Sequence, residues 1–157
     1  ITIESDNYIK LNNSNNYFFS SNSLGVADSF DGRLKTKDAF SLGGLNFKGF
    51  DFRGVGPLSS NNIYLGGNKY FTSTLGYGTN FLFDKKDNIY FKLFSTVGSV
   101  WDSDYNSNND LKLRSSAGIS FDLLTPIGPI SFIYATPIQK ELNDKDRFFN
   151  FTIGSSF

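Results

Sequence analysis

The last stretch of the chain, 146–157 (DRFFNFTIGSSF), most constrains what this sequence can fold into. One parity is mostly apolar and carries Phe149, Phe151, Ile153 and Phe157. The other parity is small or polar and carries Asn150, Thr152, Gly154 and Ser156. A period of two of this kind is typical of a strand that is apolar on one face only. Chain termini usually fray and are polar, so a Phe-rich strand that runs to the final residue needs neighbours to hold it. In a transmembrane β-barrel, lipid covers one face of such a strand and other strands pair with its edges.

The same alternation recurs along the chain and predicts further strands. Residues 111–124 alternate most cleanly, with Leu, Ile and Phe opposed to Lys, Ser, Gly and Asp. The predicted strands cover residues 1–11, 17–30, 69–83, 89–101, 111–124, 129–136 and 147–157. The connections alternate in length, and the longest covers about 31–65. Outer-membrane barrels likewise alternate short periplasmic turns with longer extracellular loops, so the pattern predicts an all-β, antiparallel transmembrane β-barrel.

Composition agrees with strands that are apolar on alternate positions only. The 157 residues include 18 Phe and 8 Tyr, yet only 39% of the residues are hydrophobic. The formal net charge is zero, which gives no support for a nucleic-acid partner. The chain has no Cys and no His, which removes thiolate and imidazole ligands and leaves no plausible nucleophile–base pair. We therefore expect no enzyme activity, no metal site and no cofactor.

A soluble sandwich of antiparallel strands is the alternative that the strand pattern leaves open. The distribution of charge favours the membrane, because the apolar faces carry few charges. The opposite faces mix Gly, Ser and Thr with Lys92, Lys112, Arg114 and Asp122, which we interpret as solvating a lumen and pairing across strands. Arg147 shares the parity of the apolar residues of the last strand. We expect it at the outer interface, where an arginine costs about 0–1 kcal/mol, compared with roughly 2–4 kcal/mol at the midplane.

The long loop has an aromatic and glycine-rich centre, residues 47–57 (FKGFDFRGVGP). Phe47, Phe50 and Phe52 make it too aromatic for a disordered linker, so we expect the loop to pack against another part of the protein. The aromatic side chains could simply plug the lumen or could serve a specific function, and the residues alone do not separate these readings. No phosphate site is expected, because the glycines are not followed by a helix or by a Lys-Ser/Thr pair.

This loop centre resembles the signature of the Omp85 superfamily of outer-membrane barrels, in which Arg-Gly-Phe is followed shortly by Val/Ile-Gly-Pro. Four later stretches resemble the closing strands of the family's barrel, in the family's order: LGGNK (65–69), GSVWD (98–102), LRSSAGISFDLLTPIGPISFIYATPI (113–138) and FFNFTIGSSF (148–157). The resemblance covers roughly residues 43–157. It implies the last seven strands of a sixteen-stranded barrel preceded by periplasmic POTRA domains, with 31–65 as the sixth extracellular loop.

The resemblance also implies a function, which is the assembly of other β-barrels in the outer membrane of a Gram-negative-type bacterium. In such family members the first and last strands pair weakly, and this seam opens to receive an incoming strand. The residues that would form the seam and the terminal signal are Phe149, Phe151, Ile153, Gly154 and Phe157. Gly154 offers little packing and weakens a strand, which favours an end that opens easily. Phe157 is equally explained as an interfacial aromatic residue.

The implied partners are unfolded outer-membrane β-barrel proteins, accessory outer-membrane lipoproteins, periplasmic chaperones and membrane lipid. Two other functions remain open within this fold. One is a superfamily pore that secretes a dedicated partner, and the other is a passive porin-like channel.

The loop signature is carried over onto Phe47, Lys48, Gly49, Phe50, Gly56 and Pro57. The chain departs from the family at the loop tip, where Lys48 stands in place of the family's arginine. The family pairs that arginine with acidic residues on the next two strands, and the matching positions here are Gly76 and Thr96. The loss is consistent on both sides, because lysine lacks the bidentate fork of arginine and its acidic partners are absent.

A second cation in the loop offers another anchor. Arg53 could reach inward, with Asp51 or Asp122 nearby. Whether Lys48 or Arg53 holds the loop is left open by the sequence.

Overall fold

The computed structural model describes residues 1–11, 16–30, 32–80, 88–106, 110–126 and 128–154. The strands are β1 (Thr2–Lys10), β2 (Tyr17–Val26), β3 (Gly49–Phe50), β4 (Lys69–Thr79), β5 (Ile89–Trp101), β6 (Arg114–Thr125), β7 (Gly128–Gln139), β8 (Asp146–Arg147) and β9 (Phe149–Ile153). Within these residues there is no helix long and apolar enough to cross a membrane.

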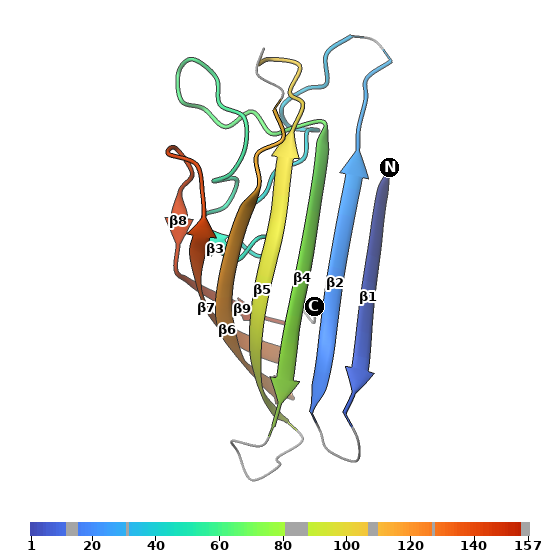
Figure 1. The fold of residues 1–157 in the computed structure, drawn as a ribbon, viewed down its shortest axis with the longest axis vertical. Helices are drawn as coiled ribbons and strands as arrows, with labels where there is room; N and C mark the ends of the chain where they lie inside the picture. The colour runs from blue at the N-terminus through green and yellow to red at the C-terminus, as the bar shows by residue number, and fades with distance from the viewer. Residues whose placement is uncertain (12–15, 31, 81–87, 107–109, 127, 155–157) are drawn as a thin grey trace.

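Seven of the strands form one antiparallel sheet in the order β1-β2-β4-β5-β6-β7-β9. The sheet is tall and curved, and β7 and β9 turn behind β5 and β6 (Figure 1). The connections from β2 to β4, from β5 to β6 and from β7 to β8 all lie at one end of the sheet (Figure 1). The predicted all-β, antiparallel barrel architecture is confirmed, although the sheet does not close on itself, because β1 and β9 are its two edges.

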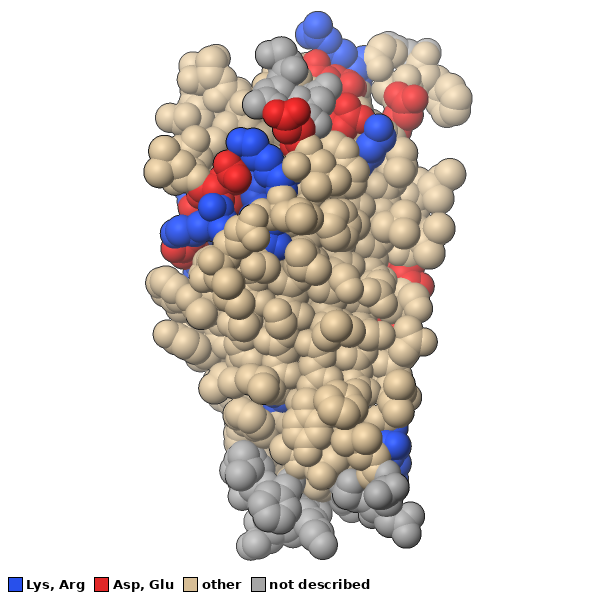
Figure 2. All heavy atoms as spheres, viewed as in Figure 1, with Lys and Arg blue, Asp and Glu red and all other residues tan. Residues whose placement is uncertain are grey.

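The two faces of the sheet differ in the way that the alternation predicts. In β9, for example, Phe149, Phe151 and Ile153 are exposed whereas Asn150 and Thr152 are buried. The exposed apolar face is the convex one that lipid would cover, and the concave face lines the lumen. Figure 2 shows Lys, Arg, Asp and Glu gathered toward one end of the visible face, beside a broad band with few charges. A charge-poor band of this kind suits the hydrocarbon layer of a membrane.

Aromatic side chains cover glycines on the concave face. A Cβ added at Gly76 would lie 2.3 Å from the ring of Phe19, and one at Gly78 would lie 2.3 Å from the ring of Tyr17. Both rings come from β2 and lie over the neighbouring strand β4. The glycines therefore leave room for rings that fill the wall from inside, which a larger residue at either position would prevent.

Several strands end elsewhere than the alternation suggests. Strand β2 stops at Val26, where its partner β4 begins at Lys69, and the backbone hydrogen bond from Ala27 N–H to the Asn68 carbonyl at 2.7 Å follows directly after the ladder. Strand β6 begins at Arg114 and not at residue 111, because the carbonyl of Lys112 accepts the side chains of Ser99 and Arg114. Strand β7 runs on to Gln139, past the predicted end at 136. Residues 81–83 of the predicted strand 69–83 lie outside the described residues.

The predicted terminal strand 147–157 is two strands. Arg147 belongs to β8, and the ladder with β7 begins again at Phe149. The break at Phe148 has a tertiary cause, which is the pairing of β8 with β3 in a second, two-stranded sheet.

Candidate functional site: the luminal loop and the terminal strand

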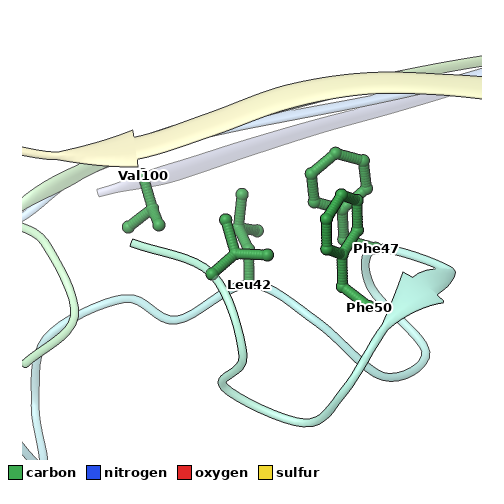
Figure 3. Close-up of a cluster of buried hydrophobic side chains, with 5 residues drawn as sticks. Leu42, Phe47, Phe50 and Val100 are labelled. Atoms are coloured by element: carbon green, nitrogen blue, oxygen red, sulfur yellow. The ribbon is translucent and has the colours of Figure 1, made fainter. Parts of the chain in front are cut away.

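The long loop packs against the concave face of the sheet through a small hydrophobic core. Five buried side chains form this core: Leu42, Phe47, Phe50, Val55 and Val100. Four of them come from the loop and lie beneath β5, which contributes Val100 (Figure 3). The rings of Phe47 and Phe50 meet with centroids 4.8 Å apart. The structure thus packs the loop as expected for two of its three aromatics, whereas the side chain of Phe52 is 72% exposed.

Two glycines of the loop signature permit this close packing. Gly49 has φ +96°, and a Cβ there would lie 3.0 Å from the Cβ of Ser116. Gly56 has φ +125°, and a Cβ there would lie 2.7 Å from the Cγ1 of Val100. Both positions combine a backbone conformation that favours glycine with space for no side chain. Pro57 follows, and its carbonyl accepts the N–H of Leu65 at 2.9 Å, which closes the loop on itself.

Lys48, at the loop tip, reaches the inner wall of the sheet. Its Nζ lies 5.1 Å from the ring centroid of Phe94, within range of a cation–π contact. Burial lowers the pKa of the Lys48 ammonium, and the nearby Lys92 ammonium lowers it further while Asp122 opposes this. The positions that are acidic in the family serve other contacts here. Thr96 shares a 2.9 Å hydrogen bond with Thr74, and Gly76 lies under Phe19.

Arg53 does not take the alternative anchoring role. Its backbone has φ +54°, and its guanidinium donates to the carbonyl of Thr36 at 3.1 Å. The two carboxylates considered for it have other partners: Asp51 pairs with Arg147 at 3.3 Å, and Asp122 pairs with Lys92 at 2.8 Å. The inward-reaching Arg53 is therefore wrong, and Lys48 is the cation that the loop tip presents to the wall.

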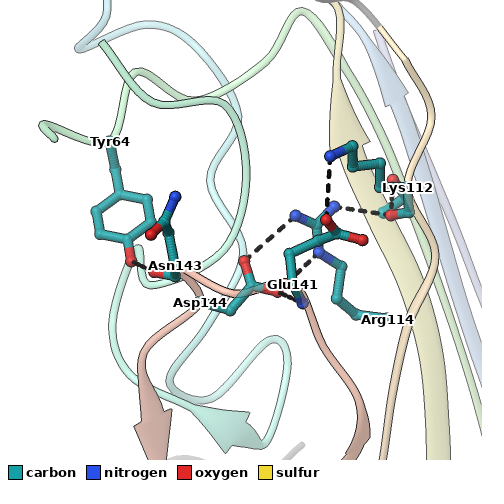
Figure 4. Close-up of polar contacts among 7 residues, drawn as sticks. Tyr64, Lys112, Arg114, Glu141, Asn143 and Asp144 are labelled. Atoms are coloured by element: carbon teal, nitrogen blue, oxygen red, sulfur yellow. Dashed lines mark hydrogen bonds and ion pairs between the residues drawn. The ribbon is translucent and has the colours of Figure 1, made fainter. Parts of the chain in front are cut away.

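A buried ion pair joins the wall to the loop that precedes the terminal strand. Arg114 donates through Nε and Nη2 to the two carboxylate oxygens of Asp144, at 3.0 and 3.2 Å (Figure 4). Both side chains are almost fully buried, at 5% and 2% exposed. Beside this pair, Lys112 meets Glu141 at 3.0 Å in a pair that is largely open to solvent. The predicted luminal placement of Arg114 thus acquires a specific partner that sequence reasoning missed.

The terminal strand β9 holds the edge of the sheet by a short ladder. Within the described residues, it pairs with Ile130–Tyr134 of β7. At the two ends, Ala135 N–H donates to the Phe148 carbonyl at 2.9 Å and Gly154 N–H donates to the Pro129 carbonyl at 2.8 Å. Because antiparallel strands direct alternate residues to opposite sides, even-numbered residues of β9 direct their backbone groups to β7. The odd-numbered ones direct theirs to the open edge, and these are Phe149, Phe151 and Ile153.

The predicted seam residues differ in where the structure places them. Phe149, Phe151 and Ile153 have exposed side chains, and their backbone groups point to the edge with which no strand of the described residues pairs. At that edge the Phe149 carbonyl accepts a hydrogen bond from Arg147 Nε at 3.3 Å. Gly154 has φ +80°, so the chain turns out of the extended conformation directly after β9. Phe157 lies outside the described residues.

The loop and the terminal segment, predicted as two separate features, meet in the structure. Gly49 pairs with Arg147 and Phe50 pairs with Asp146, which makes the small sheet β3-β8. Arg147 was expected on the lipid-facing parity, and this is wrong because its guanidinium donates to Asp51 of the loop and to the Phe149 carbonyl, both at 3.3 Å. Its depth at the outer interface stays a prediction. A period-two pattern cannot reveal such a contact, since β8 leaves the main sheet at Phe148. The sequence does contain the two opposite charges, Asp51 and Arg147, but they are far apart along the chain, so no local pattern indicates that they pair.

With this geometry, the chain can be compared with known proteins. The Omp85 superfamily domain matches residues 1–157, and the chain therefore belongs to the Omp85 superfamily. Its location is the outer membrane of a Gram-negative bacterium, as predicted.

Two relatives bear the name BamA. The chain is 33% identical to the outer membrane protein assembly factor BamA of Neisseria meningitidis serogroup B (strain ATCC BAA-335 / MC58), over 41% of this chain and 11% of that protein. Among solved structures it is similar to the crystal structure of BamA from Haemophilus ducreyi lacking POTRA domains 1–3, with a TM-score of 0.82 and 27% identity. That match covers 99% of this chain and 34% of the other, so the chain spans a minor part of the length of both relatives.

Within the described residues, no group of three or more acidic side chains is placed to hold a metal ion. What the site presents is an apolar strand with an edge that no other strand of the described residues covers, next to a firmly packed loop. Backbone donors and acceptors at such an edge are able to pair with another strand.

Proposed function

We propose that the protein containing this chain folds other outer-membrane β-barrel proteins and inserts them into the membrane by strand pairing at a lateral seam. The open edge of β9 would form one side of this seam. Unfolded barrel proteins are the proposed clients, with membrane lipid around the seam. Accessory outer-membrane lipoproteins and periplasmic chaperones are proposed as further partners. No covalent step and no cofactor enters this mechanism, and the protein is not an enzyme in this proposal.

The single observation that carries the proposal is the short ladder of β9. Unpaired N–H and C=O groups in lipid cost several kcal/mol each, so the open edge needs a partner strand. A partner held over so few residues is exchanged more easily than one held along a whole strand, because each net hydrogen bond contributes only about 0.5–1.5 kcal/mol. Within the described residues, the Asn150 amide nitrogen and the Thr152 hydroxyl also have no hydrogen-bond partner. The relatives named above, both called BamA, support the same assignment.

The experiment compares two variants that differ in one backbone donor at the open edge. Phe151→Pro deletes an N–H that points away from β7, and proline is tolerated in an edge strand on its unpaired side. Phe151→Ala is the matched control, because it loses the same ring and keeps the donor. The full-length protein and both variants are reconstituted in liposomes, and protease-protected insertion of an unfolded barrel protein is followed over time.

We expect the full-length protein to accelerate insertion over empty liposomes. Phe151→Pro should slow insertion by up to about tenfold relative to Phe151→Ala, the factor that one hydrogen bond supports. Equal rates for the two variants would count against pairing at this edge. Two outcomes would favour the other functions: steady ion conductance without accelerated insertion would indicate a passive channel, and export of one dedicated partner would indicate a secretion pore.

A further inference from the structure

The edge of β7 that faces the terminal strand is bounded by two prolines. The end hydrogen bonds of the β7–β9 ladder place the odd-numbered residues of β7 toward β9. Pro129 and Pro137 both lie on this edge, and neither has an N–H to donate. The donors between them belong to Ser131, Ile133 and Ala135. Strand β7 itself continues to Gln139, so the ladder on its β6 side is longer than the ladder on its β9 side.

The chain that precedes β9 leaves β7 where the second proline stands. If the register of the β7–β9 ladder continued, Asp146 would lie opposite Pro137 and would find no donor there. Asp146 pairs with Phe50 of the loop instead, and Arg147 pairs with Gly49. The transfer from one partner to the other takes place at Phe148, whose carbonyl accepts the last β7 donor.

The loop strand β3 sits against β7 at the same place. A Cβ on Gly49 would lie 3.0 Å from the Cβ of Ser116 and 3.4 Å from the backbone nitrogen of Pro137. Ser116 belongs to β6, so the backbone of β3 packs closely against β6 and in van der Waals contact against β7, and a side chain at position 49 would crowd the nearer strand. Phe50, the next residue, is fully buried in the loop core and fixes β3 in this position.

Backbone hydrogen bonds also join the loop after β3 to Lys145, the residue before β8. Asp51 N–H donates to the Lys145 carbonyl at 2.8 Å, and Lys145 N–H donates to the Gly54 carbonyl at 2.9 Å. Arg147 adds its ion pair with Asp51. The segment 145–147 is thus bound to the loop by backbone and side-chain contacts together, while β9 below it is bound to β7.

We propose that Pro137 and Gly49 are positioning residues that set where the terminal strand leaves the sheet. Pro137 ends the ladder by withholding a donor, and Gly49 lets β3 approach closely enough to take over the segment 145–147. The terminal strand is then free to exchange partners only below Phe148, and docking of the loop governs the upper limit of the seam. This role rests on the proposed function, whereas the geometry that it requires is measurable on its own.

The test restores the missing donor. Pro137→Ala is compared with Pro129→Ala, which restores a donor at the other end of the same edge, far from the loop. Hydrogen–deuterium exchange of the full-length protein in lipid nanodiscs is measured on peptides that cover 49–54, 136–139 and 145–148. Pro137→Ala should extend the β7 ladder upward, which slows exchange at 136–139 and accelerates it at 49–54 by up to about tenfold. Pro129→Ala should leave 49–54 unchanged.

A second pair of variants perturbs the loop directly. Gly49→Ala should accelerate exchange at 145–148, because the added Cβ would crowd Ser116 of β6 and displace β3 from the wall formed by β6 and β7. Gly32→Ala is the matched control, since Gly32 also has a positive φ of +117° but has nothing within 4 Å of the added Cβ. Unchanged exchange at 49–54 in Pro137→Ala, or equal effects of the two glycine variants at 145–148, would overturn the proposal.

The same proteins are then assayed for insertion, which separates this proposal from the proposed function. Pro137→Ala should slow insertion several-fold, because a longer ladder holds the terminal strand more firmly. If exchange shifts as expected but the parent protein does not accelerate insertion, the proposed function fails while the positioning geometry stands. If the parent accelerates insertion and Pro137→Ala inserts at the parent rate, the positioning role in the function is wrong.

Discussion

The docked loop and the terminal strand lie next to each other, yet they are held in opposite ways. The loop buries Phe47 and Phe50 completely and is flanked by the buried Arg114–Asp144 pair. Strand β9 exposes its aromatic side chains and pairs along one short ladder. Firm packing on one side and loose pairing on the other is the arrangement expected when a stable wall supports one exchangeable edge.

The contrast locates stability and function in different parts of the chain. Substitutions in the loop core should lower the free energy of unfolding or detach the loop. Substitutions on β9 should change partner exchange and have little effect on the stability of the wall. The most strongly held contacts should therefore show the largest losses on substitution, and the weakest the smallest.

The loop core should be the most sensitive region. Phe50→Ala removes a fully buried ring from the cluster and should lower the free energy of unfolding by about 3–5 kcal/mol. Phe52→Ala is the matched control, because that ring is largely exposed, and its effect should stay within about 0.5 kcal/mol. Denaturant titration of the barrel in lipid measures both. Similar losses for the two variants would show that the cluster does not hold the loop.

The buried ion pair should come next. Asp144→Ala leaves the Arg114 guanidinium buried without its carboxylate, a change that costs roughly 3–5 kcal/mol in a dry interior. Access of water to the lumen should bring the loss to the lower end of that range. Glu141→Ala breaks the neighbouring exposed pair with Lys112 and should cost about 0–1 kcal/mol. If the Glu141 variant loses as much, burial is not what distinguishes the two pairs.

The sequence predicted the wall better than it predicted the contacts across the lumen. Alternation along 149–153 and 114–124 follows from which face is apolar, so strands and faces were readable from local pattern. The packing of the loop was also readable, because its phenylalanines need apolar neighbours. The break at Phe148 was not, since Arg147 and Phe149 continue one parity and only the pairing with β3 separates them.

Long-range polar partners were equally out of reach. Asp144 lies in a polar connection that gave no sign of a partner 30 residues away on β6. Arg53 has a positive φ and donates to Thr36 within the loop, and a sequence pattern does not report the backbone conformation or the partner of a single loop residue. Ion pairs between loops depend on how the loops fold back, and this is decided by the tertiary structure.

The turn at Gly154, at the end of the loosely held strand β9, should give a smaller effect than the loop core or the buried ion pair. Gly154→Ala places a side chain at φ +80°, where an L-residue pays about 1–2 kcal/mol, although the added Cβ would meet nothing within 4 Å. The cost is therefore conformational and favours a straighter chain that breaks the hydrogen bond from Gly154 to Pro129. Hydrogen–deuterium exchange over 149–153 should accelerate by up to about tenfold, the factor that one hydrogen bond supports, while exchange over the loop core stays at the parent rate.

Gly32→Ala, with a similar backbone penalty in the distant part of the loop, should leave 149–153 unchanged. If Gly154→Ala alters the loop core as much as the strand, the two regions are one cooperative unit, and the division between a stable wall and an exchangeable edge does not hold.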